Sequence, residues 1–133
     1  LWYGCGTAWL DWLSLYDTGA GQNETQIWSL KIDMSKIKSI TTEKELQRFS
    51  YMYVDYSEYS GRGPTSMDWN RVSQKFSGIE CCHYPVTNDI SSHTKFMWYF
   101  ALDAASGCIW DTTAITNSML VAELKEDGWE VYV

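Results

Sequence analysis

The chain has 133 residues, of which 45% are hydrophobic and 20% charged, and its formal net charge is −7. This composition is typical of one globular domain and excludes a disordered chain. The acidic balance excludes non-specific nucleic-acid binding, which needs clustered Lys and Arg, and it favours a basic protein partner. Because no apolar run reaches the roughly 20 residues that a membrane-spanning helix needs, no membrane contact is expected.

The first forty residues predict one strand end, one helix and two strands. Residues 1–5 have the character of a strand that is cut at its start, so we expect native sequence before Leu1. Residues 9–16 place aromatic and aliphatic side chains at helical spacing and predict an amphipathic helix. Residues 25–33 alternate between apolar and polar side chains, which predicts a strand, and residues 37–40 predict a second, shorter one.

Two helices and a long loop are predicted in the middle of the chain. Thr42 and Glu45 have the spacing of a capping box, so a helix should begin after Thr42. The inward face of that helix should carry Leu46, Phe49 and Tyr53. Residues 55–66 have turn chemistry without periodicity and predict the longest loop. Asp68 is the predicted N-cap of the next helix, and Gly78 is its predicted left-handed end.

The rest of the chain predicts strands. Residues 79–84 alternate, residues 96–102 form an apolar run typical of a strand covered on both faces, and residues 108–110 follow a tight turn. Residues 120–133 predict a hairpin around an Asp-Gly pair. The whole chain is therefore predicted to be one α+β domain over residues 1–133, with an antiparallel or mixed sheet of about six strands and about three short helices.

The cysteines predict free thiols. They are Cys5, Cys81, Cys82 and Cys108. Cys81 and Cys82 are adjacent, so on a strand they should point to opposite faces. Buried free thiols in a reducing cytosol are the favoured interpretation, and the protein is predicted to be cytoplasmic. His83 and His93 lack the spacing of a metal site, so no metal is expected.

Two carboxylates, Glu80 and Asp103, are candidate functional residues. Each lies beside a strongly apolar segment, where a charge costs several kcal/mol unless it is paired or used. For Asp103 the favoured interpretation is a cap of the turn at Ser106 and Gly107. For Glu80 a solvated strand face and a functional site are equally supported.

Three stretches carry a family resemblance: L-W-Y-G-C-G-T-A-W-L-D-W, M-D-W-N-R-V-S-Q-K-F-S-G-I-E and F-M-W-Y-F-A-L-D-A-A-S-G-C-I-W. They resemble small bacteriophage and prophage proteins with the pattern G-L-W-x-S, I-D-W, D-G-I-E and W-D-x-A-S-G-C-I-W, over residues 1–115. That group is similar in turn to the mono-ADP-ribosyltransferase fold. Such enzymes hold NAD with a His or Arg on the first strand, and no such residue precedes Leu1 here.

The resemblance implies that NAD is the co-substrate and that ADP-ribose is transferred to a macromolecular acceptor. It implies that Glu80 stabilises the oxocarbenium-like transition state. Trp2 and Tyr3 would stack on the nicotinamide or adenine ring, and Tyr84 or Trp98 would form a wall of the pocket. The alternative is a non-enzymatic phage-encoded inhibitor or adaptor that binds a basic protein in the host cytoplasm. A third hypothesis, a carbohydrate-binding module, rests only on the eight tryptophans.

Overall fold

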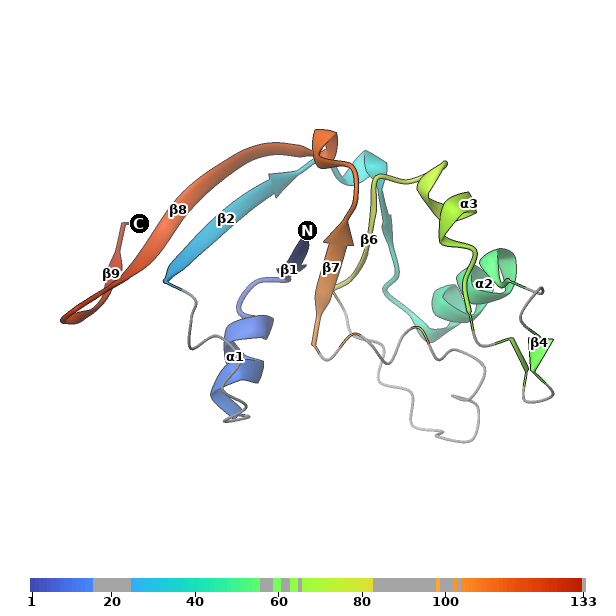
Figure 1. Ribbon diagram of the computed structural model, residues 1–133, viewed down its shortest axis with the longest axis horizontal. Helices are drawn as coiled ribbons and strands as arrows, with labels where there is room; N and C mark the ends of the chain where they lie inside the picture. The colour runs from blue at the N-terminus through green and yellow to red at the C-terminus, as the bar shows by residue number, and fades with distance from the viewer. Residues whose placement is uncertain are drawn as a thin grey trace.

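The computed structural model describes residues 1–15, 25–55, 59–60, 63–64, 66–82, 98, 102 and 104–132. These residues form an α+β fold with a four-stranded sheet, a three-stranded sheet, a two-stranded hairpin and three α-helices (Figure 1). The predicted α+β class and mixed sheet are therefore confirmed. The described strands exceed the predicted six, and they belong to separate sheets.

The four-stranded sheet carries the candidate site. In order across the sheet, its strands are β1 (Trp2–Gly4), β7 (Ser106–Ile109), β6 (Gly78–Cys81) and β3 (Ile37–Ser39). β3 runs parallel to β6, and the other neighbours are antiparallel. The register aligns Tyr3, Gly107, Glu80 and Ser39 in one row across all four strands.

The second sheet is antiparallel and extends beside the first (Figure 1). Its strands are β2 (Gln26–Ile32), β8 (Ile115–Lys125) and β9 (Gly128–Val131), and β8–β9 is the predicted C-terminal hairpin. Two short 3-10 helices, η1 (Met34–Lys36) and η5 (Thr112–Ala114), connect the sheets. Each begins at an aspartate, Asp33 or Asp111, whose carboxylate accepts from a main-chain amide two residues later.

The three helices are α1 (Ala8–Leu15), α2 (Glu43–Tyr53) and α3 (Trp69–Ser73). The predicted capping box is present: the Thr42 hydroxyl accepts from the Glu45 amide, and the Glu45 carboxylate accepts from the Thr42 amide, both at 3.2 Å. Asp68 is the N-cap of α3 as predicted. Among the described residues, no helix is long and apolar enough to cross a bilayer.

The predicted end of α3 is wrong. The helix ends at Ser73, and Gly78 belongs to strand β6 instead of ending a helix. The Ser77 amide donates to the Lys36 carbonyl at 2.8 Å, which directs the chain into the sheet. A Cβ at Gly78 would lie 2.7 Å from the Cys108 carbonyl oxygen, so this position needs glycine for close strand packing and not for a left-handed turn.

The structure describes two other predicted segments only in part. The predicted loop at residues 55–66 contains a short hairpin of β4 (Tyr59–Ser60) and β5 (Gly63–Pro64). Within the predicted strand at residues 96–102, Trp98 lies in a 3-10 turn and Leu102 is buried without regular structure. The remaining residues of that segment lie outside the described residues, as do His83, Tyr84, His93 and Asp103.

The core lies on both faces of the four-stranded sheet. The larger cluster packs one face, here called the helix-side face, against α2 and α3; it contains Ile40, Leu46, Phe49, Tyr53, Met67, Val72, Ile79, Cys81 and Leu102. A smaller cluster of Ile37, Ile109 and Ala114 covers the opposite face, with Ile32 and Ile115 of the second sheet packed against it. The opposite face is called the Glu80 face below.

Candidate functional site

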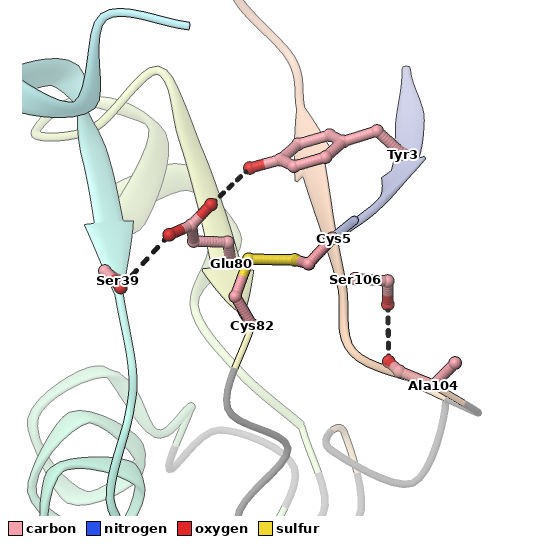
Figure 2. Close-up of a disulfide and its surroundings, with 7 residues drawn as sticks. All are labelled: Tyr3, Cys5, Ser39, Glu80, Cys82, Ala104 and Ser106. Atoms are coloured by element: carbon pink, nitrogen blue, oxygen red, sulfur yellow. Dashed lines mark hydrogen bonds between the residues drawn. A yellow bond between two sulfur atoms is a disulfide. The ribbon is translucent and has the colours of Figure 1, made fainter. Parts of the chain in front are cut away.

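Glu80 occupies the centre of the cross-strand row. Its side chain is buried, with 8% of the residue surface exposed. The Tyr3 hydroxyl donates to Oε2 at 2.9 Å, and the Ser39 hydroxyl donates to Oε1 at 3.2 Å (Figure 2). Both carboxylate oxygens therefore have a donor from another strand, which offsets the cost of burial and fixes the orientation of the group.

Gly107 allows Tyr3 to reach Glu80. It lies between them in the row, and the Tyr3 ring crosses the sheet surface directly over it. A Cβ at Gly107 would lie 2.4 Å from Tyr3 Cζ and 2.5 Å from its hydroxyl oxygen. Only glycine leaves room for this ring. The hydrogen bond between Tyr3 and Glu80 therefore depends on Gly107, although Gly107 takes no part in the bond itself.

We expect Gly107→Ala to lower the free energy of unfolding by about 1–3 kcal/mol, because the new methyl group displaces the Tyr3 ring. Urea denaturation measures this loss. In a Tyr3→Ala background the same substitution should cost much less, since the clashing ring is gone. An equal cost in the two backgrounds would contradict this explanation.

The environment of Tyr3 holds its phenol in the neutral form. Burial is the main cause, and the hydrogen bond and charge of Glu80 add to it, so the pKa of Tyr3 lies well above its ordinary value of 10.0. Above about pH 10, the unfolded chain loses this proton while the folded chain keeps it. Ionisation of Tyr3 in the unfolded state therefore destabilises the fold as the pH rises.

We expect Tyr3→Phe to lose less stability than the wild type when the pH is raised from about 9 to about 11, because phenylalanine cannot ionise. Denaturation curves of both proteins at the two pH values measure the difference. The other tyrosines and lysines contribute equally to the pH-dependent loss of stability in both proteins, so their contributions cancel in the comparison. Equal losses would show that Tyr3 titrates alike in the folded and unfolded chains.

A disulfide joins Cys5 and Cys82 on the Glu80 face, beside the carboxylate (Figure 2). Each cysteine follows a residue of the row by two positions, so strand alternation directs both sulfurs to this face. The prediction of free thiols is wrong for this pair, whose sequence separation is 77 residues. Disulfides are rare in a reducing cytosol, so this pair gives no support to the predicted cytoplasmic location.

Cys81 and Cys108 are free, as predicted. Cys81 is buried in the larger core cluster, on the opposite face from Cys82, which confirms the predicted alternation. Burial raises the pKa of the Cys81 thiol to about 12 and also raises that of Cys108. Both thiols are therefore protonated near neutral pH and are poor nucleophiles.

A cavity of about 410 Å³ lies on the helix-side face. Its walls include Trp2, Trp69, Trp98 and Trp110, and we call it the tryptophan cavity. Trp69 contacts two of the other rings: its ring centroid lies 5.5 Å from that of Trp98 and 6.4 Å from that of Trp110. The indole nitrogens of Trp98 and Trp110 donate to Ser50 Oγ and to the Phe76 carbonyl, at 2.9 Å and 2.7 Å.

The sheet separates this cavity from the Glu80 carboxylate. Glu80 borders the cavity, but its side chain bonds Tyr3 and Ser39 on the other face, so only its main chain can face the tryptophans. Its neighbours Ile79 and Cys81 point to the helix-side face. The structure thus brings Glu80 and Tyr3 together, and Trp2 and Trp98 together, but it does not join the two pairs.

Sequence reasoning missed five residues of these sites: Ser39, Cys5, Cys82, Trp69 and Trp110. Trp69 and Trp110 belong to the stretches that carry the phage resemblance, and that signal could have identified them. Ser39 has no local signal, because its role depends on the parallel pairing of β3 with β6. The predicted wall residue Tyr84 lies outside the described residues.

Comparison of the chain with protein-family models, with curated proteins and with solved structures finds no match. The phage resemblance and the ADP-ribosyltransferase fold therefore stay predictions.

Proposed function

We propose that this chain is a non-enzymatic inhibitor or adaptor that binds a basic protein partner through the tryptophan cavity. The observation that carries this proposal is the gathering of large aromatic side chains around one hollow while they remain accessible. Trp2 is 63% exposed and Trp69 is 42% exposed, although burying a tryptophan is strongly favourable. Exposed aromatic groups concentrated at a cavity are typical of interaction sites.

A cationic side chain is the occupant that best fits the cavity and its surroundings. Tryptophan faces attract Arg and Lys more strongly than other aromatic rings do. The net charge of −7 attracts a basic surface at long range. Two carboxylates, Asp68 and Asp111, directly adjoin Trp69 and Trp110 in the chain, and Asp68 is paired with Arg71 at 3.9 Å.

A pair of basic heptapeptides, identical except for arginine or uncharged citrulline at the centre, tests the proposal by calorimetry at low salt. We expect the arginine peptide to bind more tightly, and we expect Trp69→Ala to weaken its affinity at least about tenfold. Trp28→Ala is the matched control, because Trp28 is 51% exposed on β2 of the other sheet. The proposal fails if neither peptide binds, if arginine and citrulline bind alike, or if the two variants behave alike.

A second candidate, NAD-dependent mono-ADP-ribosyl transfer, is favoured by the geometry at Glu80. A buried carboxylate held by two hydroxyl donors is suited to stabilise positive charge that develops on a ribose ring. In this candidate, Tyr3 orients Glu80 instead of stacking on a ring of NAD. Trp2 and Trp98 would take no part near the reacting ribose, because their cavity lies on the other face of the sheet.

Release of nicotinamide from NAD, followed by chromatography, tests this second candidate. This candidate requires turnover by the wild-type chain and its loss in Glu80→Gln. Trp69→Ala should keep the activity, since Trp69 is on the helix-side face. No turnover, or equal turnover in Glu80→Gln, would exclude it and leave the binding function untouched.

A further inference from the structure

We propose that Cys5, Cys82 and Glu80 form a zinc site when the disulfide is reduced. The two sulfur atoms and a Glu80 carboxylate oxygen all lie within 4.8 Å of one another. Two thiolates and one carboxylate are a ligand set that suits Zn²⁺ better than the harder ions Mg²⁺ or Ca²⁺. The site lies on the Glu80 face, so it is independent of the tryptophan cavity.

The backbone keeps the two cysteines close without the disulfide. Strands β1 and β6 both pair with β7, and the Cys5 amide extends this ladder by donating to the Ala105 carbonyl at 2.9 Å. The Cα atoms of the two cysteines are 5.3 Å apart. Tetrahedral zinc holds two sulfur ligands about 3.8 Å apart, at Zn–S distances of about 2.3 Å. Side-chain rotation at this Cα separation can open the two sulfurs to that spacing.

The third ligand is already oriented. Tyr3 and Ser39 each donate to a different oxygen of Glu80, and a carboxylate oxygen has a second lone pair for a metal ion. Such outer contacts fix the direction of a ligand and raise metal affinity. Within the part of the chain that the structure describes, the group has three ligands, which leaves one position of a tetrahedral zinc ion for water.

The disulfide becomes a zinc site in two steps, reduction and then metal binding. A dithiol reductant transfers two electrons and two protons to the Cys5–Cys82 bond, becomes a disulfide itself, and leaves two thiols. Zn²⁺ then replaces the two thiol protons, which pass to solvent. Reduction therefore creates the site and oxidation removes it, so zinc occupancy depends on the redox state of the surroundings.

Cobalt binding tests the proposal, because Co²⁺ bound by thiolates gives a charge-transfer band in the near ultraviolet. The full chain is reduced with a dithiol, desalted under nitrogen and titrated with Co²⁺. We expect one equivalent to bind, with displacement by Zn²⁺ and no band in the oxidised protein. The band should be lost in Cys5→Ser and Cys82→Ser, weakened at least about tenfold in Glu80→Gln, and unchanged in Cys108→Ser, which removes a free thiol elsewhere.

Thermal unfolding of the reduced chain is a second measurement, needed because reduction can itself destabilise the fold. We expect Zn²⁺ to raise the melting temperature of the reduced protein, or to restore its circular dichroism if it has unfolded, and to leave the oxidised protein unchanged. The proposal is overturned if reduced wild type shows no cobalt band, if the band survives in Cys82→Ser, or if Zn²⁺ has no effect on the reduced fold. Any of these results would identify the pair as a structural disulfide only.

Discussion

Cys82→Ser is expected to lower the free energy of unfolding by about 3–5 kcal/mol, because it removes the Cys5–Cys82 disulfide. The disulfide joins residues 77 positions apart. In the chain-entropy description, closing a loop of this length lowers the entropy of the unfolded state and raises its free energy by about 4.5 kcal/mol at room temperature. The bond links the residue after β1 to the residue after β6, and the loop that it closes includes α2 and α3.

Urea denaturation in the presence of a chelator measures this effect without a contribution from metal ions. Reduced wild type and Cys5→Ser should match Cys82→Ser, and the double variant should be no less stable than either single one, because all of them remove the same bond. Cys108→Ser is the control and should cost about 1 kcal/mol or less, as expected for a substitution that breaks no covalent link. Equal losses in Cys82→Ser and Cys108→Ser would contradict a stabilising disulfide.

Features whose signal lies within a few neighbouring residues could be predicted from the sequence. Within one helical turn, the side chains of Thr42 and Glu45 each accept a hydrogen bond from the main-chain amide of the other residue. The Asp68 side chain likewise accepts from an amide three residues later. The alternation in residues 25–33 reports a strand for the same reason. These local preferences agree with the final fold, so tertiary contacts did not override them.

Features that depend on distant segments could not be predicted. Gly78 is glycine because the carbonyl of Cys108, on the neighbouring strand, approaches it. Cys5 meets Cys82 because both of their strands pair with β7. Neither the β7 pairing nor its register has a local signature, which is why the interpretation of Gly78 as a helix end and of Cys5 and Cys82 as free thiols was wrong.

The separation of the two sites had a sequence signal that was not used. Trp2 and Tyr3 are adjacent on a strand, so they must point to opposite faces and cannot both stack on one ligand beside Glu80. The structure puts Tyr3 with Glu80 and Trp2 in the tryptophan cavity. Alternation alone therefore distinguishes residues that position the carboxylate from residues that can bind a partner.

The core beneath the tryptophan cavity links stability to the proposed binding. Phe49 is 3% exposed on α2, with its ring centroid 4.9 Å from that of Tyr53 and 5.6 Å from that of Trp98. The next residue, Ser50, accepts the hydrogen bond from the Trp98 indole. This part of α2 therefore supports one wall of the cavity through packing and through a polar contact.

We expect Phe49→Ala to lower the free energy of unfolding by about 3–5 kcal/mol, because it removes a buried ring and leaves a void. Since Trp98 loses a packing partner, the affinity for the arginine heptapeptide should fall as well, even in conditions where the variant is folded. Met52→Ala is the control on the same helix: Met52 is 46% exposed, and its loss should cost about 0.5 kcal/mol or less. Urea denaturation and calorimetry measure the two quantities. A folded Phe49→Ala variant with unchanged peptide affinity would show that Trp98 keeps its place without this ring, and the binding proposal would then rest on Trp2, Trp69 and Trp110.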